Sequence, residues 1–74
     1  MEFPRITLAA ARVNAGLTQA AAAEKLGITR STLQNYETGK TVPDWSMVKR
    51  IEEVYQFPAD FIFFAAQVRF KRIL

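Results

Sequence analysis

The side chains best suited to chemistry lie close together in residues 27–40, GITRSTLQNYETGK. Helical spacing buries Leu33 and Tyr36 and turns a set of hydrogen-bonding side chains outward. The outward set is Arg30, Ser31, Gln34 and Asn35. Because a guanidinium and two amides form directed hydrogen bonds in a plane, this set is suited to recognising another molecule.

One carboxylate, Glu37, lies on the inner side of the same predicted helix, four residues after Leu33. A buried carboxylate without a partner costs roughly several kcal/mol. We therefore expect a cationic side chain close to Glu37 inside the domain.

The composition argues against most enzyme mechanisms. The 74 residues include no Cys and no His, which excludes thiol nucleophiles, disulfides, the usual zinc ligands and the commonest general base. The chain has seven carboxylates, and no two of them are placed as a catalytic pair. We expect no catalytic residues, no bound metal and no cofactor.

Nothing in the sequence predicts a membrane segment. The longest apolar run, residues 61–66, is far shorter than the ~20 residues that a membrane span needs, and no apolar stretch follows a basic N-terminus as in a signal peptide. A chain without cysteine suits a reducing compartment. We expect a cytoplasmic protein with no membrane partner.

The net charge of +3 comes from the C-terminal end of the chain. Residues 1–67 carry equal numbers of basic and acidic side chains, and Arg69, Lys71 and Arg72 supply the excess. The body of the domain therefore has no broad positive field. Binding of an anionic polymer must come from locally placed side chains.

Glycine and proline residues divide the chain into five segments, which predicts an all-α, compact five-helix domain in residues 1–67. The predicted helices cover residues 4–14, 19–26, 30–38, 44–55 and 58–66. Thr18 and Thr29 are the expected N-cap residues of the second and third helices. Residues 68–74 form a basic and apolar C-terminal arm, where alternating residue types favour a short strand or an extended conformation.

The fourth predicted helix carries an apolar stripe that should face the core. Its members are Trp45, Val48, Ile51, Val54 and Tyr55. The aromatic residues that follow, Phe57, Phe61, Phe63 and Phe64, are also expected to be mainly core residues.

The second and third predicted helices are joined by a few residues around Gly27, and so short a turn forces two helices to cross steeply. This is the helix-turn-helix arrangement. Counting from Gln19, Ala23 is the fifth residue, where a bulky side chain would collide with the next helix, and Gly27 is the ninth. The expected buried positions are Ala22, Leu26, Ile28, Leu33 and Tyr36.

The segment LTQAAAAEKLGITRSTLQNYETGKTVPDWSMVKRI resembles the lambdoid-repressor and Cro type of helix-turn-helix domain, the XRE family. The resemblance covers about residues 5–65 and rests on the combination Leu17-Thr18-Gln19, Ala23, Leu26-Gly27, Tyr36-Glu37, Gly39 and Pro43. Ala22 departs from the family, which usually has Leu there, and residues 68–74 lie beyond the usual motif.

The resemblance implies that the third helix enters the DNA major groove while the second lies across the backbone. The implied base contacts are Arg30, Ser31, Gln34 and Asn35. The implied phosphate contacts are Gln19, Thr18, Thr29, Thr32, Lys40 and Thr41. The family also pairs an arginine of the first helix with the acidic residue of the third, which here implies an inward ion pair between Arg12 and Glu37.

Aromatic and apolar residues near the C-terminus exceed what so small a core needs, and exposed apolar patches usually mark interfaces. We therefore expect a homodimer contact there. Its predicted residues are Phe61, Phe64, Val68, Phe70, Ile73 and Leu74. For residues 68–74, a disordered basic end and an arm that follows the DNA backbone are alternatives.

Taken with the resemblance, the sequence predicts a sequence-specific double-stranded DNA-binding transcriptional regulator of a bacterial host cell, associated with the nucleoid. The expected type is a phage or prophage repressor of the Cro or CI type, bound as a homodimer to a pseudo-palindromic operator. Two alternatives stay open. One is an antitoxin that represses its own operon and holds a toxin, and the other is a protein-interaction or membrane-surface module. The sequence does not identify a protein partner such as a toxin or an antirepressor.

Overall fold

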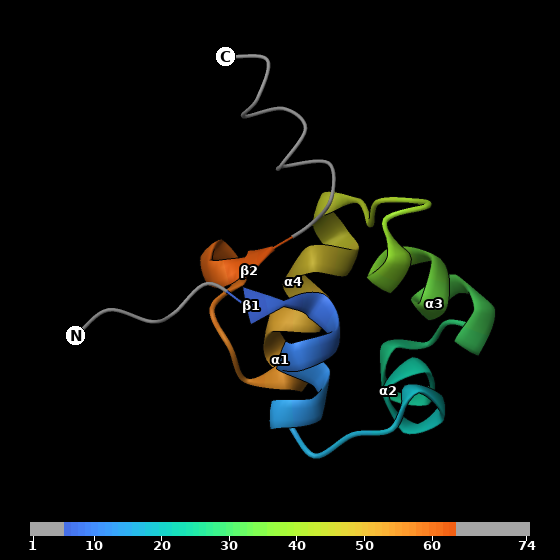
Figure 1. Ribbon diagram of the computed structural model, residues 1–74, viewed down its shortest axis with the longest axis horizontal. Coiled ribbons are helices and arrows are strands. Elements are labelled where there is room, and N and C mark those ends of the chain that lie inside the picture. Colours follow the sequence, from blue (N-terminus) through green and yellow to red (C-terminus); the bar gives the residue numbers. More distant parts are fainter. Residues whose placement is uncertain (1–5, 64–74) are drawn as a thin grey trace, which may run out of the picture.

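The computed structural model describes residues 6–63, which fold into four α-helices, a 3-10 turn and one pair of very short strands. The helices are α1 (Leu8–Asn14), α2 (Gln19–Leu26), α3 (Arg30–Thr38) and α4 (Trp45–Tyr55). The 3-10 turn η1 covers Ala59–Phe61. Figure 1 shows α1 and α4 side by side, with α2 and α3 grouped together on the other side of the molecule.

Each α-helix is preceded by an N-cap residue whose side chain accepts a hydrogen bond from a backbone N–H of the first turn. The cap residues are Thr7, Thr18, Thr29 and Asp44. The helices α2 and α3 end at Gly27 and Gly39, whose φ angles of 74° and 82° are left-handed and favour glycine. These signals explain why the predicted bounds 19–26 and 30–38 are confirmed.

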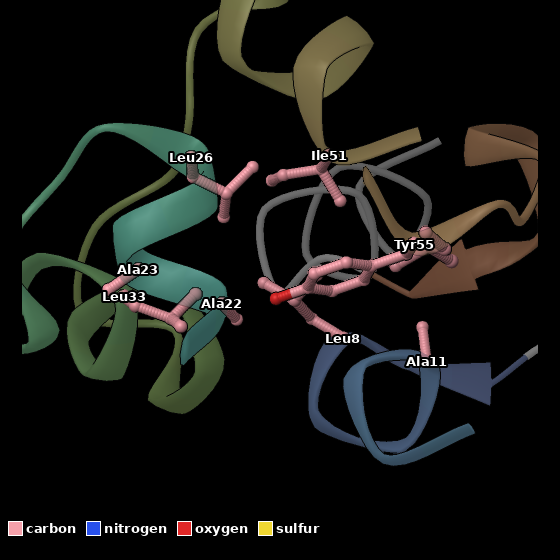
Figure 2. Packing of buried hydrophobic residues seen from close by; sticks show 9 residues of the cluster. Leu8, Ala11, Ala22, Ala23, Leu26, Leu33, Ile51 and Tyr55 are labelled. Carbon is pink, nitrogen blue, oxygen red and sulfur yellow. The ribbon is translucent and has the colours of Figure 1, made fainter. Parts of the chain in front are cut away.

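The core is small and connects all four helices. Its buried members are Leu8, Ala11, Ala22, Ala23, Leu26, Leu33, Ile51, Tyr55 and Ile62. Figure 2 shows Leu26 of α2 and Ile51 of α4 pointing toward each other, while the ring of Tyr55 reaches from α4 toward α2. Alanines at positions 22 and 23 allow α2 to approach its neighbours closely, because they add little side-chain volume to the contact.

The prediction of five helices is wrong, whereas the prediction of an all-α fold is confirmed. Of the predicted fifth helix, the structure describes residues 58–63, which form the 3-10 turn η1 and then the strand β2 (Ile62–Phe63). This strand pairs in parallel with β1 (Ile6–Thr7), with Ile6 opposite Ile62. The pairing buries Ile62 almost completely, to 1% exposure, and this long-range contact outweighs the local helical pattern.

The first helix also begins later than predicted, at Leu8 instead of residue 4. Ile6 and Thr7 are extended because they form β1, and the Thr7 hydroxyl then caps α1 by accepting a hydrogen bond from Ala10 N at 3.0 Å. The predicted arm in residues 68–74 lies outside the described residues.

Trp45 does not belong to the apolar stripe of α4, and its prediction as a core residue is wrong. The side chain is 72% exposed, and the Lys49 ammonium lies 5.6 Å from the centre of the indole ring. The cause is helical geometry: Trp45 and Lys49 are four residues apart on the outer face, whereas the stripe that faces the core contains Ile51 and Tyr55.

Candidate nucleic-acid interface

The turn between α2 and α3 is defined by the residue that ends α2 and by the residue that caps α3. Gly27 provides the left-handed residue after α2, and Thr29 caps α3 by accepting a hydrogen bond from Thr32 N at 3.1 Å. Arg50 of α4 reaches this turn, where its Nη1 donates to the carbonyl of Leu26 at 3.1 Å. The last turn of α2 is therefore attached to α4 by a charged donor.

The outer face of α3 is polar along its length. Only Leu33 is buried in this helix, and Arg30, Ser31 and Gln34 are exposed. Asn35 is half-buried, so it lies at the edge of this face. Thr38 is exposed and follows Ser31 and Gln34 at helical spacing, which places it on the same face. Thr38 is not among the contact residues predicted from the sequence, although the spacing of positions 31, 34 and 38 indicates it.

Arg12 and Glu37 form an ion pair between α1 and α3. Arg12 Nε donates to Glu37 Oε2 at 2.7 Å, and the two side chains are only 15% and 6% exposed. Arg12 Nη1 also donates to the Leu17 carbonyl at 2.9 Å. The carboxylate on the inner side of α3 thus has the cationic neighbour that its burial requires, and the cation is itself held by the backbone.

Gln19, the first residue of α2, joins this pair to the outer face of α3. Gln19 Nε2 donates to Glu37 Oε1 at 2.9 Å. On its other side, Gln19 Oε1 accepts from Arg30 Nε at 3.4 Å. A continuous polar connection therefore runs from Arg12 through Glu37 and Gln19 to Arg30.

Several of the predicted phosphate contacts are threonines that already have structural roles. The Thr18 hydroxyl accepts from Ala21 N at 3.1 Å as the cap of α2. The hydroxyls of Thr29 and Thr32 lie 2.9 Å apart and share a hydrogen bond. These side chains and the first backbone N–H groups of α2 and α3 lie at helix N-termini, where an anion is favoured by the helix dipole.

The loop after α3 is fixed by backbone hydrogen bonds. The N–H groups of Lys40 and Thr41 both donate to the Asn35 carbonyl, at 2.9 and 3.3 Å. Both side chains are exposed. A lysine ammonium and a hydroxyl are thereby presented at the C-terminal end of α3, opposite the end that carries Arg30.

Tyr55 places a polar atom in the core. The residue is 3% exposed, and its hydroxyl has no hydrogen-bond partner among the described residues. Burial and, to a smaller extent, the negative charge of Glu37 raise the pKa of Tyr55 to about 12, against the opposing effect of the positive charge of Arg12. The phenol therefore stays neutral at any physiological pH.

Of the predicted dimer residues, the structure describes Phe61, which is half-buried in η1. Phe64, Val68, Phe70, Ile73 and Leu74 lie outside the described residues.

Within residues 6–63, no group of three or more His, Cys, Asp or Glu side chains is arranged to hold a metal ion. The same part of the chain contains no helix long and apolar enough to cross a membrane.

The helices α2 and α3 are joined by a short turn, both have capped N-termini, and the second has a polar outer face. These features define a helix-turn-helix domain. Comparison with protein families agrees: residues 5–61 match the family described as a helix-turn-helix domain. The chain belongs to this family, a class of DNA-binding domains, because the match covers most of its length. No curated protein matches the chain, and no solved structure does.

Proposed function

We propose that this helix-turn-helix domain is a sequence-specific double-stranded DNA-binding transcriptional regulator of the Cro or CI repressor type. The observation that carries the proposal is the exposed polar face of α3, formed by Arg30, Ser31, Gln34 and Thr38. An α-helix with such a face fits the width of the major groove, where each base pair presents a distinct pattern of donors and acceptors.

The chemistry of the face fits base recognition. Arg30 can donate to guanine O6 and N7, and Gln34 or Asn35 can pair with adenine N6 and N7. Ser31 lies in the first turn of α3, close to Arg30, and is short enough to bond either a base or a phosphate. Each bidentate contact would contribute about 1 to 3 kcal/mol of discrimination against a wrong base.

Phosphate contacts would come from both ends of this face. At the N-terminal end, Thr18 caps α2, and Thr29 and Thr32 surround the start of α3. At the other end, Lys40 and Thr41 are exposed. Groups at both ends could contact the two strands that border one groove, which would fix the register of α3 on the bases.

The charge balance makes this placement important. Residues 6–63 carry as many acidic as basic side chains, so no broad positive field attracts DNA to this part of the molecule. Affinity must then depend on a few local contacts, and the number of phosphates neutralised should be small. We expect the logarithm of the affinity to fall linearly with the logarithm of the salt concentration, with a slope of about −0.9 for each phosphate neutralised. A small number of such contacts then gives a small total slope.

Repression would follow from occupation of promoter DNA by a homodimer. Two copies related by a two-fold axis would place their α3 helices in successive major grooves about 34 Å apart, which requires a pseudo-palindromic operator. The dimer contact is proposed for Phe61, Phe64 and the apolar residues of the segment 68–74.

Selection of bound DNA from a random double-stranded pool, followed by sequencing, tests the proposal. We expect enrichment of a two-fold symmetric site with half-sites about one helical turn apart, and binding that weakens as salt rises. A pool that stays random, with binding that salt does not change, would show that the chain is not a sequence-specific DNA-binding protein.

A further inference from the structure

We propose that Glu37 is a positioning residue for Arg30 and acts through the side-chain amide of Gln19. In this arrangement the ion pair between α1 and α3 also sets the direction of a side chain on the DNA-facing surface. The inference rests on the proposed function for its DNA-binding consequence, whereas the contacts themselves lie within the free protein.

The orientation of the Gln19 amide follows from its two neighbours. An ionised carboxylate only accepts hydrogen bonds, so the amide nitrogen must face Glu37, and the distance from Nε2 to Oε1 is 2.9 Å. A guanidinium only donates, so the amide oxygen must face Arg30. Both neighbours require the same orientation, and a flipped amide would lose both bonds.

The carboxylate that sets this orientation is itself held firmly. Arg12 donates to one Glu37 oxygen at 2.7 Å and is attached to the Leu17 carbonyl at 2.9 Å. The Glu37 side chain is 6% exposed, so water does not compete strongly for its oxygens. Glu37 can therefore act as a fixed acceptor.

The contact between Gln19 and Arg30 is weak, but it restrains the orientation of the Arg30 side chain. The distance from Arg30 Nε to Gln19 Oε1 is 3.4 Å, which is long for an N–H···O bond, and Arg30 is exposed. Because the contact uses Nε, it leaves Nη1 and Nη2 as donors for guanine O6 and N7. An arginine restrained in this way loses less side-chain freedom when it binds a base.

The alternative role for Gln19 is an independent phosphate contact. The two roles differ in one measurable property. If Gln19 acts through Arg30, its removal should matter only while Arg30 is present, but if Gln19 contacts a phosphate by itself, the two effects should add.

A double-mutant cycle on DNA affinity distinguishes these roles. The variants are Gln19→Met, which keeps the length of the side chain without its hydrogen bonds, Arg30→Ala, and the two combined. DNA obtained by selection with the wild-type protein is the probe. We expect Gln19→Met to weaken binding about threefold or more in the wild-type background and to have little effect in the Arg30→Ala background.

The matched control cycle combines Gln19→Met with Lys40→Ala. Lys40 is exposed at the opposite end of α3, so the two effects should add. Additive effects with Arg30→Ala as well would overturn the inference even though DNA binding itself is intact. Wild-type protein that selects no DNA sequence would instead refute the proposed function.

A measurement on the free protein tests the same inference without DNA. We expect the Arg30 Nε–Hε group to show a distinct, restrained NMR signal in the wild type and to become mobile in both Gln19→Met and Glu37→Gln. Glu37→Gln is informative because a glutamine both donates and accepts, so it no longer imposes one orientation on Gln19. Variants that fold normally with an unchanged Arg30 signal would rule out positioning by Glu37.

Discussion

The helices α3 and α4 are held in place by different means. Both begin at a capping side chain, and both end at a residue with left-handed backbone, Gly39 in α3 and Gln56 in α4. The helix α4 is held mainly by burial of Ile51 and Tyr55, whereas α3 buries a single residue. The position of α3 depends in addition on the hydrogen bonds that Arg12 and Gln19 donate to the Glu37 carboxylate.

This difference separates stability from recognition. Burial of apolar side chains stabilises the fold without directing individual polar groups, because the hydrophobic effect has no preferred direction. A hydrogen-bonded ion pair adds little net stability but fixes geometry, and here it connects to the surface that faces outward. The helix α4 thus supports the domain, and α3 is oriented by a polar network suited to a binding surface.

The largest effect should come from the core side of α4. Ile51 is 0% exposed, so Ile51→Ala should lower the free energy of unfolding by about 2 to 5 kcal/mol, measured by urea denaturation. The matched control is Trp45→Ala in the same helix. Trp45 is 72% exposed, and its removal should change stability by about 0.5 kcal/mol or less. Equal losses in the two variants would contradict the assignment of the core face.

A smaller loss of stability is expected when the ion pair between Arg12 and Glu37 is broken. Arg12→Met leaves the Glu37 carboxylate without its cation and should lower the free energy of unfolding by about 1 to 3 kcal/mol, seen as a lower Tm. Replacing both partners, with Arg12→Met and Glu37→Leu, should recover much of the loss because no charge remains buried. A melting curve that Arg12→Met does not shift would show that the pair contributes nothing to the fold.

The smallest effect, and one of opposite sign, should come from Tyr55→Phe. This change removes a buried hydroxyl that has no partner among the described residues, and we expect a gain of about 1 kcal/mol. Burial raises the folded-state pKa of Tyr55 from 10.0 to about 12, so the wild type should lose stability as pH rises from 10 to 12, when the unfolded chain deprotonates first. The gain should therefore be larger at pH 11 than at pH 8. A pH-independent difference would contradict the raised pKa.

The middle of the fold could be predicted from the sequence, since its signals are local. A capping threonine, a few helical turns and a glycine with positive φ define both α2 and α3 within consecutive residues. The ends could not be predicted in the same way. Ile6 and Ile62 are far apart in the sequence, and their pairing converts the expected first and fifth helices partly into extended chain.

In the candidate site, too, the local features could be predicted from the sequence, whereas the contacts of Gln19 could not. The outward positions of Arg30, Ser31 and Gln34 follow from helical spacing, and the approach of Arg12 to Glu37 follows from the family resemblance. The contact of Gln19 with both Glu37 and Arg30 depends on the angle between α2 and α3, which the sequence does not give. The roles of these residues in DNA binding remain predictions.

The most direct test of the account compares matched changes on α3 and α4. Arg30→Ala with Ser31→Ala removes one cation and one hydroxyl from the exposed face of α3, and Lys49→Ala with Ser46→Ala removes one cation and one hydroxyl from the exposed face of α4. Affinity for selected DNA should fall about tenfold or more for the α3 pair, with loss of sequence preference, and change about twofold or less for the α4 pair. Equal losses for the two pairs, with sequence preference intact, would contradict the assignment of α3 as the DNA-recognition helix.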